Sequence, residues 1–164
     1  MAEKDKIGMD SALIKSANWE LACERIVHDL KSDFIFAPHF QYIFEHGSET
    51  LIKELKTDLK NGKFVAQPPI HIEVPKSSRF KEVHTKRRGP SFSRRWSILL
   101  PKDRLLYQML ADEIAEEVEK NTDRRRCFSN ELNEIDEEAF FYPTRYSWGK
   151  FQKKIRKLAK KKEK

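Results

Sequence analysis

The chain has 164 residues, of which 38% are hydrophobic and 36% charged, which suits one domain with a highly charged surface. Lys and Arg outnumber Asp and Glu by 33 to 26, giving a net charge of +7, so we expect polyanionic partners such as RNA or DNA. No apolar stretch approaches the roughly 20 residues that cross a bilayer. These features exclude an integral membrane protein, and we expect no membrane partner.

The first segment, residues 1–10, is charged and lacks the apolar core of a secretory signal, so we expect a flexible N-terminus. The chain has only two cysteines and five histidines, which form neither a disulfide framework nor a zinc-binding spacing. We therefore expect a cytoplasmic protein without a metal or other cofactor in this chain.

A helix is predicted over residues 11–30, where apolar residues recur at spacings of three to five and Trp19 is a bulky anchor. The next segment, residues 32–48, is rich in Phe around Pro38 and is predicted to be a loop. Its aromatic rings suit either core packing or a platform for stacked bases, and packing is the favoured interpretation.

A second helix is predicted over residues 48–62. Ser48 can cap its N-terminus, Leu51, Leu55 and Leu59 form a stripe at intervals of four, and Gly62 ends it.

Two strands follow. Apolar residues alternate with polar ones in PIHIEVPK, which is typical of a strand with one buried face, and WSILL at 96–100 is the second strand. Because no crossover helix separates them, the strands are predicted to pair antiparallel.

The connection between these strands, residues 76–95, contains eight Lys or Arg and one acid, with Phe80 and Phe92 interleaved. A solvated loop is one interpretation, and a phosphate-binding hairpin tip is the favoured one. The candidate nucleic-acid ligands in this tip are Arg79, Lys81, Lys86, Arg87 and Arg88.

The stretch ILLPKDRLLYQML marks the joint between the second strand and a third helix. Pro101 stops strand pairing and Asp103 can cap the helix, whose predicted apolar stripe is Leu106, Leu110, Ile114 and Val118. Lys102 and Arg104 lie near the helix N-terminus, where cations are unfavourable. Either the acidic segment 131–138 or a nucleic-acid phosphate is expected to compensate them.

The last predicted helix has an apolar stripe of Trp148, Phe151, Ile155 and Leu158, and nine Lys or Arg follow from Lys150 onward. The terminal residues 159–164 are predicted to be a disordered basic tail, because like charges repel one another. The fold class is therefore α+β, with N-terminal helices, a β-hairpin with a long basic tip, and further helices.

The order of several motifs resembles the N-terminal fingers region of bacterial reverse transcriptases, particularly those related to group II introns and to phage defence or abortive infection. The matching motifs are WELACERI, a helix and strand ending in Pro75 and Lys76, RRWSILLPKDRLLYQML with its Tyr107 and Gln108, CFSNEL, and SWGKF. The resemblance covers roughly residues 17 to 158, and the corresponding predicted domain is 11–158.

The resemblance implies that Lys76 and either Arg94 or Arg95 bind the triphosphate of an incoming deoxynucleotide while the hairpin covers an RNA or DNA template. A Lys point charge and a bidentate Arg suit the charge of phosphoryl transfer. It also places Arg124, Arg125 and Arg126 at the start of a second motif near the template.

Polymerases of this family use two Mg²⁺ ions held by palm aspartates, including an adjacent pair, and the chain has no Asp-Asp pair. We therefore expect a noncatalytic fingers portion that works with a palm segment or chain. The alternative is a free-standing basic module that binds RNA or DNA without chemistry.

Overall fold

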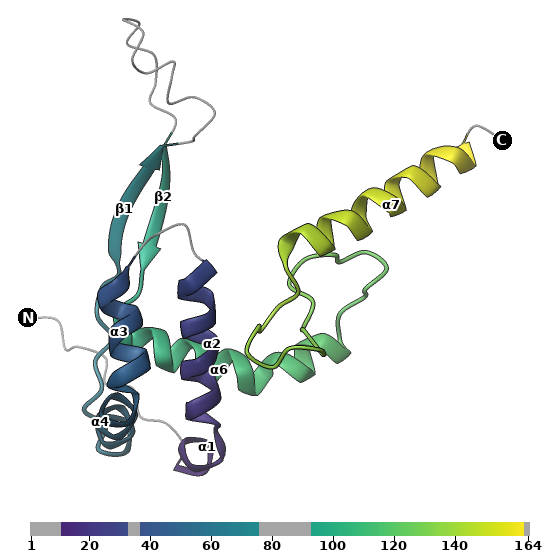
Figure 1. Cartoon of the computed structure of the whole chain (residues 1–164). Coiled ribbons are helices and arrows are strands. Elements are labelled where there is room, and N and C mark those ends of the chain that lie inside the picture. Colours follow the sequence, from purple (N-terminus) through teal and green to yellow (C-terminus); the bar gives the residue numbers. More distant parts are fainter. Residues whose placement is uncertain (1–10, 33–36, 76–92, 163–164) are drawn as a thin grey trace, which may run out of the picture.

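The computed structural model describes residues 11–32, 37–75 and 93–162. It combines helices with one small antiparallel sheet, which confirms the α+β composition but identifies no polymerase fold. The helices α1 to α4 and α6 enclose the core, the hairpin projects from one end, and α7 extends to the other side (Figure 1).

The predicted helix 11–30 is in fact two helices, α1 (Ser11–Ser16) and α2 (Trp19–Ser32). Asn18 interrupts it, because its side-chain Oδ1 accepts a hydrogen bond from the backbone N–H of Leu21 and so caps the new helix. The indole Nε1 of buried Trp19 donates to the carbonyl of Ile14 over 2.9 Å. This bond ties the short α1 to the start of α2.

The loop predicted for residues 32–48 is wrong over its second half, which forms helix α3 (Pro38–His46). Pro38 is tolerated there because it occupies the first turn, where its missing N–H leaves no helix bond unmade. The favoured packing role is confirmed for Phe40 and Phe44, which are buried in the core, whereas Tyr42 is exposed.

Helix α4 (Ser48–Lys60) contains the predicted stripe of Leu51, Leu55 and Leu59, all buried. Gly47 rather than Ser48 is its N-cap residue, so the predicted serine cap is wrong. Gly62 follows the helix with φ of 59°, a left-handed conformation that favours glycine.

The two strands are β1 (Ile70–Pro75) and β2 (Ser93–Ile98), and they pair antiparallel as predicted. Ile70 pairs with Ile98 and Ile72 with Trp96, so the second strand begins and ends earlier than the predicted 96–100. Leu99 and Leu100 instead connect the strand to the next helix, because Pro101 begins that helix.

Helix α6 (Pro101–Lys120) buries Leu105, Leu106 and Met109 against the helical core. The predicted stripe is correct for Leu106 but wrong beyond it, because Leu110, Ile114 and Val118 are 38%, 59% and 56% exposed. Beyond Met109 the helix extends away from the core cluster (Figure 1), so among the described residues no helix covers its later apolar side chains.

The predicted cap of α6 by Asp103 is also wrong. Leu100 is the N-cap residue, and Asp103 Oδ1 instead accepts a hydrogen bond from the backbone N–H of Gln67 over 3.1 Å. The carboxylate therefore ties the segment before β1 to the first turn of α6.

Residues 121–143 form turns with an isolated bridge between Leu132 and Phe141, and lead into α7 (Thr144–Lys162). Helix α7 includes residues 159–162, part of the segment predicted to be disordered. The main core cluster runs from Ile14 to Met109, so within the described ranges α7 adds nothing to it. None of the helices among these residues has the length and apolar character needed to span a membrane.

Candidate nucleotide and nucleic-acid interface

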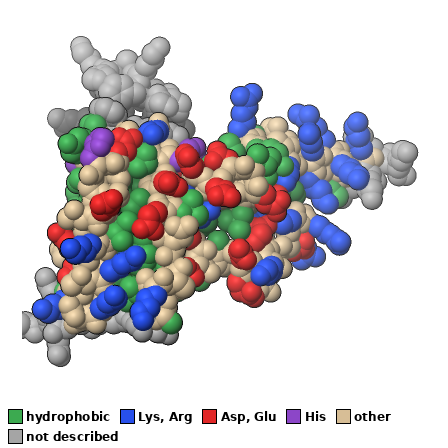
Figure 2. Space-filling model, turned by 60° about the horizontal axis from the view of Figure 1, so that its bottom comes forward, with side chains coloured by type: hydrophobic (Ala, Val, Ile, Leu, Met, Phe, Trp, Pro, Cys, Tyr) green, Lys and Arg blue, Asp and Glu red, His purple; other side chains and the backbone are tan. Residues whose placement is uncertain are grey.

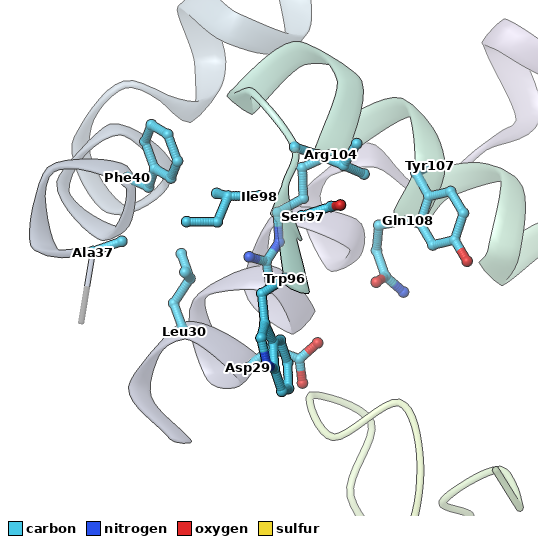
Figure 3. A pocket seen from close by; sticks show the side chains of 11 residues that line it. Asp29, Leu30, Ala37, Phe40, Trp96, Ser97, Ile98, Arg104, Tyr107 and Gln108 are labelled. Carbon is cyan, nitrogen blue, oxygen red and sulfur yellow. The ribbon is translucent and has the colours of Figure 1, made fainter. Parts of the chain in front are cut away.

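A cleft of about 270 Å³ lies where the base of the hairpin meets α2, α3 and α6. Arg104, Tyr107 and Gln108 extend from α6 on one side, and Leu30, Ala37 and Phe40 lie on the other, with Trp96 and Ser97 of β2 between them (Figure 3). Its volume lies just below the usual range for small-molecule pockets. The cleft therefore suits one ring or one phosphate group better than a whole nucleotide.

The chemistry of this cleft is mixed. Arg104 supplies a cation, Asp29 an anion and Trp96 an indole, while the Tyr107 ring is 66% exposed at the edge. An exposed ring can stack on a base while a neighbouring Arg contacts a phosphate. The sequence resemblance singled out Arg104, Tyr107 and Gln108, and the structure places all three on this cleft.

Gln108 is buried and holds its place in α6 through a polar network. Its Nε2 donates to Asp112 Oδ1 over 2.7 Å, and the same oxygen accepts a hydrogen bond from Arg25 Nη1 at 2.7 Å. Asp112 and Arg25 are each only 16% exposed at the side chain. This network links α2 to α6 and holds Gln108, which lines the cleft, in position.

The hairpin presents Arg95 to solvent. Its side chain is 85% exposed and lies 3.7 Å from the Glu73 carboxylate across the strand pair. An ion pair this exposed contributes little stability, so Arg95 can exchange its partner for a phosphate. The backbone register pairs Arg94 with Val74, and the choice between Arg94 and Arg95 as triphosphate ligand stays a prediction.

The other predicted ligands of the hairpin tip lie outside the described residues. They are Lys76, Arg79, Lys81, Lys86, Arg87 and Arg88.

Lys102 has a partner that neither sequence-based alternative named. Its Nζ lies 2.9 Å from Asp58 Oδ2 and 3.1 Å from Glu54 Oε2, both on α4, and the hydrogen bond to Asp58 raises the pKa of the lysine. The predicted ion pair with residues 131–138 is therefore wrong for Lys102. Two carboxylates compensate the cation near the N-terminus of α6, and a phosphate would have to compete with them.

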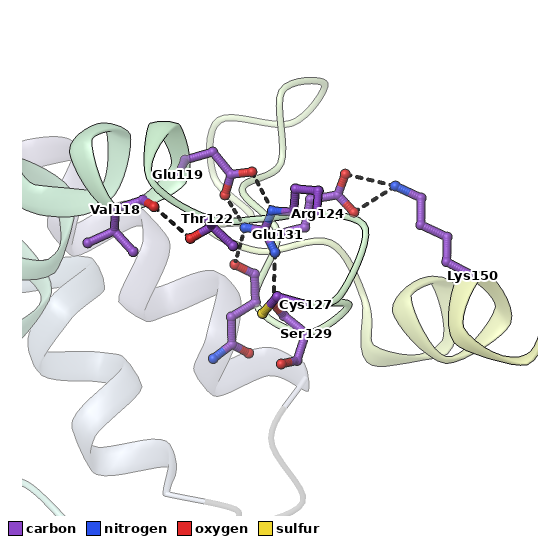
Figure 4. A network of polar contacts seen from close by, with 9 residues as sticks. Val118, Glu119, Thr122, Arg124, Cys127, Ser129, Glu131 and Lys150 are labelled. Carbon is purple, nitrogen blue, oxygen red and sulfur yellow. Dashed lines mark hydrogen bonds and ion pairs between the residues drawn. The ribbon is translucent and has the colours of Figure 1, made fainter. Parts of the chain in front are cut away.

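Arg124 is engaged within the chain. It binds both carboxylate oxygens of Glu119 and donates to the carbonyls of Ser129 and Asn130 (Figure 4). Such a bidentate pair fixes the position of the guanidinium group. Arg124 therefore stabilises the turn at the end of α6, and a phosphate would have to displace these partners. Arg125 and Arg126 are exposed, although Arg126 lies 3.6 Å from Asp123.

Helix α7 carries a row of exposed Lys and Arg side chains that the sequence analysis does not name as candidate ligands. Figure 2 shows Lys and Arg side chains projecting along this arm, with Asp and Glu gathered near its junction with the body. The exposed cations include Lys153, Lys154, Arg156, Lys157 and Lys160. The sequence places these cations on the last predicted helix and at the start of the basic tail 159–164, and the motif resemblance gives them no binding role.

No match was found when the chain was compared with protein-family models, curated proteins and solved structures. Within the part of the chain that the structure describes, no group of three or more His, Cys, Asp or Glu is arranged to bind a metal ion.

Proposed function

We propose that this chain is the fingers portion of an RNA-directed DNA polymerase, which contacts the template and the triphosphate of the incoming deoxynucleotide. The observation that carries the proposal is the cleft between the hairpin base and α6, lined by Trp96, Arg104, Tyr107 and Gln108. The two elements that the motifs match thus form one surface, whose cleft suits one ring or one phosphate group of the nucleotide while the exposed Tyr107 at its edge is open to a base.

The connectivity supports the same proposal. An antiparallel hairpin leads through Leu99 and Leu100 directly into a helix that begins at Pro101. The base of the hairpin, beside the first turns of α6, would then face the nucleotide. Arg95 of β2 does not line the cleft, but its side chain is 85% exposed and is available to a polyanion that runs along the hairpin.

We further propose that the chain does not polymerise alone and requires Mg²⁺ bound by a palm segment. Three of its carboxylates have structural partners that support this division of labour. Asp103 accepts from Gln67, Asp112 binds Arg25 and Gln108, and Asp136 accepts from the backbone of Glu138.

A second candidate function is a basic RNA- or DNA-binding module without chemistry. The observation in its favour is the exposed cationic surface of α7, which does not need the cleft. This module would bind polymers through counterion release but would have no use for Arg104 or Tyr107.

Ultraviolet crosslinking of a radiolabelled deoxynucleotide triphosphate, with and without a template and primer, separates these functions. Arg104→Ala should lower the crosslinking yield about tenfold or more, because a hydrogen bond to a charged group is worth about 1.5 to 3 kcal/mol. Tyr107→Phe should retain stacking and yield. Arg145→Ala, a change of an exposed cation on α7, is the matched control and should leave nucleotide crosslinking unchanged.

Polymer affinity is measured in parallel with labelled RNA and DNA. Arg87→Ala with Arg88→Ala should weaken it, whereas Lys76→Ala should reduce nucleotide crosslinking and leave polymer binding nearly intact. Equal effects of the two changes on polymer binding would remove the separate triphosphate role of Lys76. Absent nucleotide crosslinking with intact polymer binding would favour the module instead.

A polymerase assay tests the division between fingers and palm. The purified chain with template, primer, Mg²⁺ and all four deoxynucleotides should make no DNA, because two-metal chemistry requires paired carboxylates. DNA synthesis by this chain alone, after contaminating polymerases are removed, would contradict the proposal.

A further inference from the structure

The second half of α6 has an apolar stripe with an acidic border. Leu110, Ile114 and Val118 are each more than a third exposed, and their spacing of four places them on one face of the helix. Glu113 and Glu117 are also exposed and lie beside this stripe. An apolar surface bordered by one sign of charge is typical of a helix that packs against a partner of the opposite sign.

Helix α7 carries the complementary surface. Trp148, Ile155 and Leu158 are 56%, 49% and 48% exposed and lie on one face of the helix. Lys154 and Arg156 border that face and are exposed as well. The stripe on α7 is therefore apolar with a basic border, where that on α6 is apolar with an acidic border.

The two stripes also match in length. At a rise of about 1.5 Å per residue, Leu110 to Val118 spans about 12 Å and Trp148 to Leu158 about 15 Å. The crossing of two helices of this length buries two to three turns of each.

Within one chain the stripes do not meet, since both are exposed and α7 points away from α6 (Figure 1). Polar contacts at the junction hold this direction. Arg124 binds Glu119 at the end of α6, and Lys150 Nζ lies 2.7 Å from both carboxylate oxygens of Glu131. A second molecule can reach both stripes without disturbing these contacts.

We propose that α6 and α7 form a homodimer interface, in which α7 of each copy packs on α6 of the other. A twofold axis generates the second contact from the first, so one association covers all four exposed stripes. Charge complementarity selects this partner. RNA or an anionic lipid surface would attract α7. It would leave the apolar stripe of α6 exposed, and it would repel the acidic residues that border that stripe.

Sedimentation velocity of the full 164-residue chain tests the proposal. The wild-type chain should be a dimer at micromolar concentration, and Ile114→Lys or Ile155→Glu should each raise its dissociation constant at least tenfold. Tyr42→Glu is the control, because Tyr42 is a hydrophobic residue on α3 that is more exposed than Ile114 or Ile155, and it should leave the dimer intact. Circular dichroism verifies that all variants are folded.

Charge reversal distinguishes this interface from any other self-association. One variant carries Glu113→Lys and Glu117→Lys, and the other carries Lys154→Glu and Arg156→Glu. Each should be monomeric alone, because its two contacts then join like charges, whereas an equimolar mixture should form a heterodimer in which both contacts join opposite charges.

Three results would overturn the proposal: a monomeric wild-type chain, dimers insensitive to the changes in both stripes, or a mixture that stays monomeric. A wild-type monomer that binds phosphatidylserine vesicles or RNA through α7 would assign that helix to the other partner. The proposal does not depend on the proposed function, because nucleotide crosslinking and self-association are measured separately.

Discussion

Replacement of Leu105 by alanine should destabilise the fold by about 3 kcal/mol. Leu105 is completely buried in the core at the first turns of α6. The change removes three carbon atoms, worth about 2.4 kcal/mol at about 0.8 kcal/mol for each buried carbon. Incomplete collapse around the cavity adds to this transfer cost, and comparable substitutions range from about 2 to 5 kcal/mol.

Ile114→Ala on the same helix is the matched control. Ile114 is 59% exposed, and alanine has the higher helix propensity by a few tenths of a kcal/mol, so its free energy of unfolding should change by less than about 0.5 kcal/mol.

Urea unfolding followed by tryptophan fluorescence measures both changes. The protein concentration must be low enough to keep the chain monomeric, so that the proposed dimer does not contribute. With a slope of about 2 kcal/mol per molar urea, the midpoint for Leu105→Ala should fall by about 1.5 M. Equal losses from Leu105→Ala and Ile114→Ala would refute the burial pattern assigned to α6.

Three further outcomes are expected. Cys127 is exposed and Cys23 is buried, and burial raises the pKa of the Cys23 thiol to about 12. Iodoacetamide at pH 8 should therefore modify one cysteine in the native chain and two after denaturation, as counted by mass spectrometry. The hydrogen bond from Arg124 lowers the pKa of Glu119 from 4.5. The stability that this pair supplies should be complete above that pH and lost as the pH falls below it, and Glu119→Gln should remove this part of the acid dependence of urea unfolding. The affinity for RNA and DNA, measured by fluorescence anisotropy, should fall steeply as the salt concentration rises and should show little preference among sequences. An affinity independent of salt would contradict phosphate binding.

The helical periodicity predicted α4 well because its stripe is buried along its whole length, as Leu51, Leu55 and Leu59 show. The same rule failed on α6, since Ile114 and Val118 repeat at the correct spacing but extend beyond the helices that could cover them. Spacing identifies a shared face of a helix, but it carries no information about where the partner helix ends.

Local interactions at helix ends explain the other differences between the predicted and the observed helices. Asn18 divides the first predicted helix through a single side-chain hydrogen bond, and such a competing cap is hard to distinguish from a helical Asn in sequence. Pro38 favours a loop when it is considered as a helix breaker, but at the first turn of a helix, where it lies in α3, Pro is favourable.

For the candidate site, Arg104, Tyr107 and Gln108 of the motif after Pro101 line one cleft, and their role in binding stays a prediction. The motif could not show that Lys102 faces Asp58 of α4, because that contact joins elements 44 residues apart.

The position of the core has a consequence for the way the chain opens. The apolar cluster ends at Met109. The described residues from the turns after α6 to α7 meet the body through Arg25 of α2, whose Nε donates to the Glu137 carbonyl over 2.8 Å and whose guanidinium lies 4.9 Å from the centroid of the Phe140 ring. Segments with few buried apolar contacts open at a lower free energy than the global unfolding transition. At concentrations that keep the chain monomeric, amide hydrogens of α7 should therefore exchange well before those of α2 and α4, because α7 opens at a lower free energy than the core helices.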